Sequence, residues 1–126
     1  METYKKYSQT TRGRAVILFN KIKNRCISKN KGIVSIDVDW IEQKIKNGVC
    51  ELSGLPFDLA PNNQFHRNPN SPSLDRIDNS NRDYSPENTR VVLTSLNGAI
   101  NEYGLEHFLK TAIAVLHKQG KYHGRI

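Results

Sequence analysis

The stretch that decides the fold is Pro-Ser-Leu-Asp-Arg-Ile-Asp at residues 72–78, followed by a polar loop and Thr-Arg-Val-Val-Leu at residues 89–93. Residues 73–77 and 89–93 are both candidate strands, and the second is apolar and rich in β-branched side chains. The Asp, Asn, Ser and Pro residues between them favour turns. Because Thr94 or Ser95 can serve as an N-cap, we expect a helix to follow the second strand directly.

Helical patterns lie on both sides of this strand–loop–strand–helix unit. On its N-terminal side, apolar residues recur with the spacing of one helix face from position 10 or 11 to Cys26. A second helix is predicted to begin at Asp39, which has the spacing of a capping box with Glu42. On the C-terminal side, an apolar stripe predicts a final helix over residues 105–117.

The segment between the second helix and the first strand is less regular. Residues 49–57 indicate a short strand and turn, and the three prolines and four asparagines of residues 58–72 are typical of a loop. The predicted fold class is α+β, with a ββα core, two N-terminal helices, a C-terminal helix and little sheet.

The length of 126 residues fits one domain. We expect a single domain over residues 1–126, made of a basic helical part (1–48), a ββα module (49–103) and a C-terminal helix with its tail (104–126).

The net charge of +7 is concentrated at the N-terminal end. Residues 1–31 hold nine Lys and Arg against Glu2 alone, whereas the rest of the chain holds ten basic and eleven acidic residues. Such a local positive field suits a polyanionic partner, here by way of Arg14, Lys21 and Arg25 on the first helix. A solvated helix face is an equally good explanation of the charge taken alone.

Other protein classes are not favoured. No apolar run is long enough to span a membrane, and the N-terminus has no signal-peptide pattern, so a cytoplasmic protein without membrane partners is expected. Cys26 and Cys50 are too few for a disulfide framework or a four-ligand zinc site, and we expect both to be buried apolar side chains.

The central stretch resembles the HNH, or ββα-metal, endonuclease family. Asp75-Arg76-Ile77 stands where many members have Asp-His-Ile, Asn88 matches the middle Asn, and Asn97 lies nine positions further, like the family's last ligand. The resemblance covers residues 49–103, most sharply 72–101, and it is closest to phage-type sequences with an Asp-Arg-Ile-Asp phrase. It implies a bacterial or phage-infected host cell.

The resemblance implies an endonuclease that hydrolyses DNA phosphodiester bonds with one Mg²⁺ or Mn²⁺ ion, RNA being a further possible substrate. A hard ion takes oxygen ligands and needs few protein side chains, so Asp75 and Asn97 suffice as metal ligands. Asn88 is expected to brace the loop between the strands. No structural zinc is expected, because neither of the family's Cys-x-x-Cys pairs is present.

The catalytic base is the main departure from the family. Arg76 occupies the position of the usual His, and an arginine cannot accept a proton from water, so we expect it to contact phosphate instead. The remaining candidates for the base are a water on the metal, His66 and Tyr84.

Four arginines flank the proposed site and are expected to bind phosphates together with the basic first helix: Arg67, Arg76, Arg82 and Arg90. Two other functions stay open. One is a nucleic-acid-binding or regulatory protein with the same fold and impaired catalysis. The other is an adaptor whose basic helix meets an acidic protein.

Overall fold

Helices and one small sheet make up the fold of this computed structural model, which describes residues 7–29, 32–61 and 67–121. In chain order the elements are α2 (Thr11–Lys29), α3 (Val38–Lys46), β1 (Pro72–Arg76), β2 (Thr89–Leu93), α4 (Thr94–Ile100), the 3₁₀ helix η1 (Asn101–Tyr103) and α5 (Leu105–Lys118). The fold is therefore α+β, as predicted, and each predicted helix and both central strands are confirmed to within a few residues.

The sheet consists of β1 and β2 alone, paired antiparallel. Leu74 lies opposite Val91, and Asp75 lies opposite Arg90. Because side chains alternate between the faces of a strand, Leu74 and Val91 point to one side of the sheet and Asp75 points to the other. This register places apolar and chemically active side chains on different faces.

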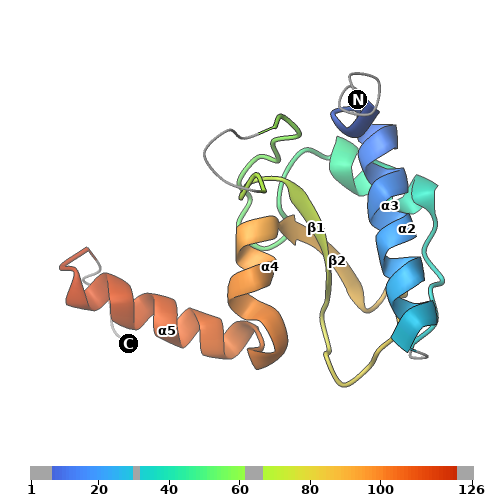
Figure 1. The fold of residues 1–126 in the computed structure, drawn as a ribbon. Helices are drawn as coiled ribbons and strands as arrows, with labels where there is room; N and C mark the ends of the chain where they lie inside the picture. The colour runs from blue at the N-terminus through green and yellow to red at the C-terminus, as the bar shows by residue number, and fades with distance from the viewer. Residues whose placement is uncertain (1–6, 30–31, 62–66, 122–126) are drawn as a thin grey trace.

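Helices cover both faces of the sheet (Figure 1). α2 packs against α3, and the pair lies on the face that carries Leu74 and Val91. The core on this side consists of Ala15, Ile22, Ile36, Ile41, Ile45, Leu74, Tyr84 and Val91. α4 packs on the other side, where Cys50 joins Val92 and Leu93 in a smaller cluster. The prediction of a buried Cys50 is confirmed, since its exposed fraction is 1%.

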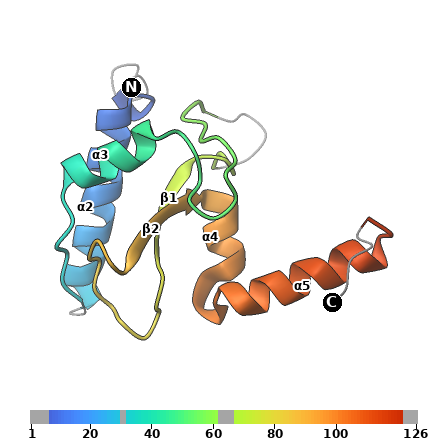
Figure 2. The ribbon, with the colours of Figure 1, turned by 180° about the vertical axis from the view of Figure 1, so that it is seen from behind.

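α5 extends away from the rest of the molecule in both views (Figures 1 and 2). It contacts α4, and none of its residues is buried. Leu109, Val115 and Leu116 are exposed on it. Among the described residues, moreover, no helix combines the length and the apolar character needed to cross a membrane.

Two predicted helix caps are wrong. Asp37, in extended conformation, is the N-cap of α3, and its carboxylate accepts a hydrogen bond from Trp40 N at 2.8 Å. Asp39 instead lies in the first turn, where it pairs with Arg12. Leu93 precedes α4 because β2 runs into the helix without a loop, and the Thr94 hydroxyl donates to Ser71 O at 2.9 Å.

The strand predicted within residues 49–57 is also wrong. Only an isolated bridge joins Val49 to Pro56, and a backbone hydrogen bond from Cys50 N to Leu55 O closes the turn between them. The segment is too short to continue pairing, so it forms a turn beside β2 and holds Cys50 in place.

Candidate active site

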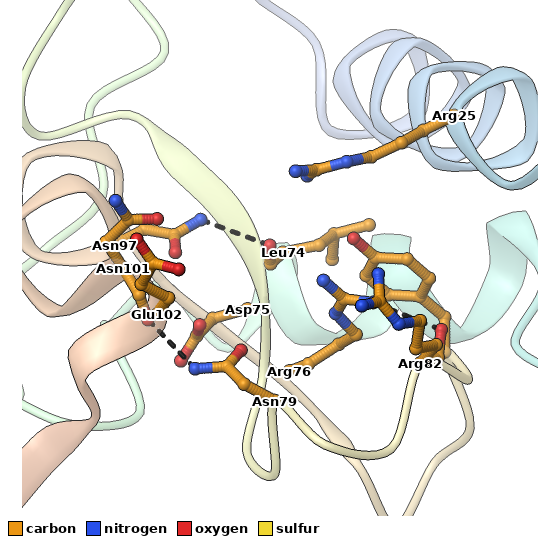
Figure 3. A pocket seen from close by; sticks show the side chains of 10 residues that line it. Arg25, Leu74, Asp75, Arg76, Asn79, Arg82, Asn97, Asn101 and Glu102 are labelled. Carbon is orange, nitrogen blue, oxygen red and sulfur yellow. Dashed lines mark hydrogen bonds between the residues drawn. The ribbon is translucent and has the colours of Figure 1, made fainter. Parts of the chain in front are cut away.

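A polar cleft of about 330 Å³ lies between α2, β1, the loop after β1 and the end of α4. Figure 3 shows this cleft from close by. Its lining consists of Arg25, Leu74, Asp75, Arg76, Asn79, Arg82, Tyr84, Asn97, Asn101 and Glu102. Asp75, Arg76 and Asn97 were predicted as site residues from the sequence, so the fold brings them to one cavity.

The cleft has an oxygen-rich side and a guanidinium side (Figure 3). The carboxylates and amides, Asp75, Asn79, Asn97, Asn101 and Glu102, gather beside α4 and η1. The three arginines, Arg25, Arg76 and Arg82, lie toward α2 and the far end of the loop. A ligand with negative oxygens can therefore meet guanidinium groups on one side while a cation is held on the other.

Asp75 is 5% exposed, and its Oδ2 accepts a hydrogen bond from Arg90 Nε at 2.7 Å. Its other oxygen, Oδ1, receives no hydrogen bond from the described residues. Within that part of the chain, the only fully buried side-chain oxygen or nitrogen without a partner is Thr89 Oγ1. Oδ1 of Asp75 is therefore open to the cleft.

Arg90 does not serve as predicted. It lies directly opposite Asp75 in the sheet, and its side chain is 12% exposed. Because its guanidinium is packed and paired with a buried carboxylate, it is not available to bind phosphate. The expectation that Arg90 contacts nucleic acid is thus corrected.

Asn97 projects from α4 onto β1. Its Nδ2 donates to Ser73 Oγ at 2.7 Å and to Leu74 O at 3.1 Å. Both bonds use the amide nitrogen, which fixes the orientation of the group and leaves Oδ1 without a donor among the described residues. Asp75 and Asn97 thus line the same cleft, each with one oxygen that is not committed to hydrogen bonding within the described chain.

Asn88 braces the loop between the strands, as predicted. Its Oδ1 accepts from Asp78 N at 2.9 Å, and its Nδ2 donates to Asn81 O and Asp83 O, each at 3.0 Å. Hydrogen bonds from the side chain and backbone of Ser80 lower the pKa of Asp78, which accepts them through the carboxylate. This second aspartate of the Asp-Arg-Ile-Asp phrase is therefore committed to the loop.

The same loop is fixed to the segment that joins α2 to α3. Tyr84 N donates to Ile33 O and Ser35 N donates to Tyr84 O, each at 2.9 Å. Gly32, with φ at +83°, approaches so closely that an added Cβ would lie 2.2 Å from Arg82 O. The arginine side of the cleft is thus positioned by residues 50 positions earlier in the chain.

Arg76 lies over the ring of Tyr84, with 5.3 Å from its guanidinium carbon to the ring centroid. Its Nη1 donates to Arg82 O at 3.3 Å. No acidic side chain of the described residues pairs with it, so most of its donors face the cleft. Tyr84 itself is 2% exposed and packs in the core, which confirms that it anchors the loop.

The other predicted basic residues lie beside the cleft. Lys21 and Arg67 line a neighbouring pocket, and Arg14 lines a further one. Burial lowers the pKa of Lys21, and the charges of Arg67 and Arg25 lower it further. His66, a predicted candidate for the base, falls outside the described residues.

The sequence interpretation missed Asn79, Asn101 and Glu102. Asn101 lies four positions after Asn97, and this helical spacing indicates a shared face. Asn79 Nδ2 donates to Asn101 O at 2.9 Å, a contact that no sequence pattern indicates. These residues complete the oxygen-rich side of the cleft.

Within the described residues no three His, Cys, Asp or Glu side chains gather in a group that could hold a metal ion. The oxygen donors of the cleft are instead one carboxylate and several amides, a set that suits a hard ion retaining much of its water.

No family model, curated protein or solved structure matches the chain. The site therefore has to be judged by its own geometry.

Proposed function

We propose that the chain is a metal-dependent endonuclease of the HNH type that hydrolyses DNA phosphodiester bonds in this cleft. The observation that carries the proposal is the convergence of Asp75 and Asn97, each with one uncommitted oxygen, opposite the guanidinium of Arg76. A phosphodiester needs both parts, since its charge must be neutralised and its leaving oxygen stabilised.

Asp75 Oδ1 and Asn97 Oδ1 are the atoms that would hold one Mg²⁺ or Mn²⁺ ion. The bound ion would neutralise phosphate charge and make water a stronger nucleophile. The protein positions the two ligands separately, because Arg90 fixes the carboxylate while Ser73 and the backbone of Leu74 fix the amide.

Arg76 binds the phosphate in the cleft in this proposal, with Arg25 and Arg82 beside it. Its stacking on Tyr84 restricts the side chain, so less conformational entropy is lost on binding. A guanidinium stays protonated and can donate two parallel hydrogen bonds to phosphate oxygens. Replacement of the family's usual His by Arg therefore adds affinity but removes a base.

Glu102 is the proposed base. Apart from Asp75 it is the only carboxylate among the residues that line the cleft, and it is exposed to solvent there. Asp75 is committed to Arg90, and Tyr84 is packed in the core. His66 stays a prediction from the sequence.

A second candidate function is binding of nucleic acid without cleavage. The Asp75–Arg90 ion pair favours it, because an arginine already neutralises the carboxylate that the metal would use. The two functions make different predictions for a cleavage assay, whereas both predict binding.

The test is cleavage of plasmid DNA and labelled oligonucleotides in Mg²⁺, Mn²⁺ or EDTA. Asp75→Asn alone leaves Arg90 as an unpaired buried charge, which costs about 3–5 kcal/mol of stability. The informative variant is therefore the pair Asp75→Asn with Arg90→Gln, which removes both charges. We expect metal-dependent cleavage by the native chain and a loss of at least about 100-fold in the pair.

Two further variants separate the roles. Glu102→Gln should retain DNA binding but lose cleavage and its rise with pH, since the proton acceptor is gone. If the native chain binds DNA and cuts it in neither metal, the endonuclease proposal is wrong and the second candidate function is supported. If DNA is not retained at about 0.1 M salt, an acidic protein partner is favoured instead.

A further inference from the structure

A second pocket of about 180 Å³ adjoins the cleft, on the side of α2. Its wall shares Arg25, Leu74, Tyr84 and Asn97 with the cleft, so the two cavities are continuous. The residues that belong to this pocket and not to the cleft are Leu18, Lys21, Ile22, Arg67 and Ser73.

The pocket concentrates positive charge without a counter-ion. Lys21, Arg25 and Arg67 line it, and no Asp or Glu is among its lining residues. None of the three forms an ion pair with the described residues, although other surface cations do, such as Lys44 with Glu51. Burial and the two neighbouring guanidinium groups also lower the pKa of Lys21, which independently shows that these cations are close together.

The polar groups between the three cations add a further donor. Ser73 Oγ accepts from Asn97 Nδ2 at 2.7 Å, so its own hydroxyl hydrogen remains available to donate. Leu18 and Ile22 supply an apolar wall. A cavity with ammonium, guanidinium and hydroxyl donors but no carboxylate selects an anion with several oxygens.

The cations also continue along α2. Arg14, Lys21 and Arg25 are spaced seven and four residues apart, which places them along one side of a helix. Arg14, Lys21 and Arg67 line a third pocket, of about 340 Å³, on the far side of the second. The three cavities therefore form a continuous basic groove from the cleft along α2.

We propose that the second pocket binds a backbone phosphate of the nucleic-acid strand whose neighbouring phosphate lies in the cleft. The groove beyond it then follows the same strand along α2. This inference rests on the proposed function for the place of the scissile phosphate, but binding in the pocket requires neither metal nor cleavage.

The experiment measures binding of a labelled duplex of about 20 base pairs in EDTA, by fluorescence anisotropy, between about 0.05 and 0.3 M salt. The test variant is Lys21→Gln with Arg67→Gln. The matched control is Lys118→Gln with Lys121→Gln, which removes the same charge from the distal end of α5 and the residues after it. All four side chains are exposed, and thermal unfolding verifies that each variant is folded.

We expect the pocket variant to bind at least about tenfold more weakly at 0.1 M salt. Its plot of log affinity against log salt should be less steep by about 1.8, which is 0.9 for each lost phosphate contact. The control should keep the native slope. Inorganic phosphate at millimolar concentration should not displace the duplex, since one pocket contributes only part of the binding.

Equal slopes in the two variants would overturn the subsite, as would absence of binding by the native chain. Competition by inorganic phosphate at that concentration would also overturn it, in favour of a site for small phosphates. The paired Asp75→Asn, Arg90→Gln variant should bind like the native chain. If the native chain binds with the expected slope but cuts nothing, the subsite stands and the endonuclease proposal alone is wrong.

Discussion

At position 75 a single buried carboxylate faces two possible cations. Arg90 holds its Oδ2, while Oδ1 is open to the cleft. The guanidinium keeps Asp75 charged and oriented, but it also reduces the negative charge that a metal ion would meet. Affinity for the ion and stability of the empty protein are therefore coupled at this pair.

Arg90→Gln should show this coupling. Without metal the variant should lose about 3 kcal/mol of stability, because the buried carboxylate is left unpaired. Mn²⁺ should then raise the melting temperature more in the variant than in the native protein, since the ion replaces the missing charge. The measurement is thermal unfolding in EDTA and in excess Mn²⁺. Equal increases in the two proteins would contradict the metal site, and the paired variant with Asp75→Asn serves as a blank.

The residue scale also separates what sequence can and cannot predict. The bracing role of Asn88 was predictable, because its partners lie within ten residues in a loop that must turn. The pairing of Arg90 with Asp75 was not, since it depends on the register of two strands, and a shift by one residue would turn Arg90 to the other face.

Among the elements, the loop between β1 and β2 matters most for the cleft, and its position depends on the segment after α2. Gly32 approaches the backbone of Arg82, and Tyr84 pairs with Ile33 and Ser35 on either side. A change at Gly32 should thus alter the guanidinium side of the cleft without touching its residues.

Gly32→Ala and Gly48→Ala test this connection. Both glycines have nearly the same φ, +83° and +84°, so each substitution carries the same backbone strain of about 1 kcal/mol. An added Cβ at Gly32 meets Arg82 O at 2.2 Å, whereas at Gly48 the nearest atom is 3.9 Å away. Urea unfolding should show a larger loss for Gly32→Ala, together with weaker DNA binding. Similar losses in the two variants would show that the contact is unimportant.

The elements themselves were largely predictable because their signals are local. Apolar periodicity located α2 and α5, and β-branched residues located β2. Their boundaries were harder to predict, since Asp37 and Asp39 are equally good caps by type and only the backbone conformation decides between them. The turn at residues 49–57 failed as a strand because it has a single bridge in place of a ladder.

The whole molecule consists of a layered body and one helix that leaves it. The cleft needs side chains from α2, β1, the loop, α4 and η1 together, which is why Glu102 and Asn79 escaped the sequence interpretation. α5 contributes to neither the cleft nor the groove, and none of its residues is buried.

Removal of residues 110–126 should therefore leave the body intact. The shortened chain keeps the first turn of α5, where Leu105 and Phe108 are half-buried. We expect a cooperative thermal transition within about 3 °C of the native one, since little apolar surface is lost from the folded state. Loss of cooperativity on calorimetry would mean that the distal part of α5 supports the body after all.

The outward course of α5 has a practical consequence for experiments on single molecules. With 14 residues, the helix is about 20 Å long. A dye or a surface linker attached near Lys118 would sit at the end of this rod, remote from α2 in both views (Figure 2). The protein could then be immobilised by that end while its basic groove stays open to a passing strand.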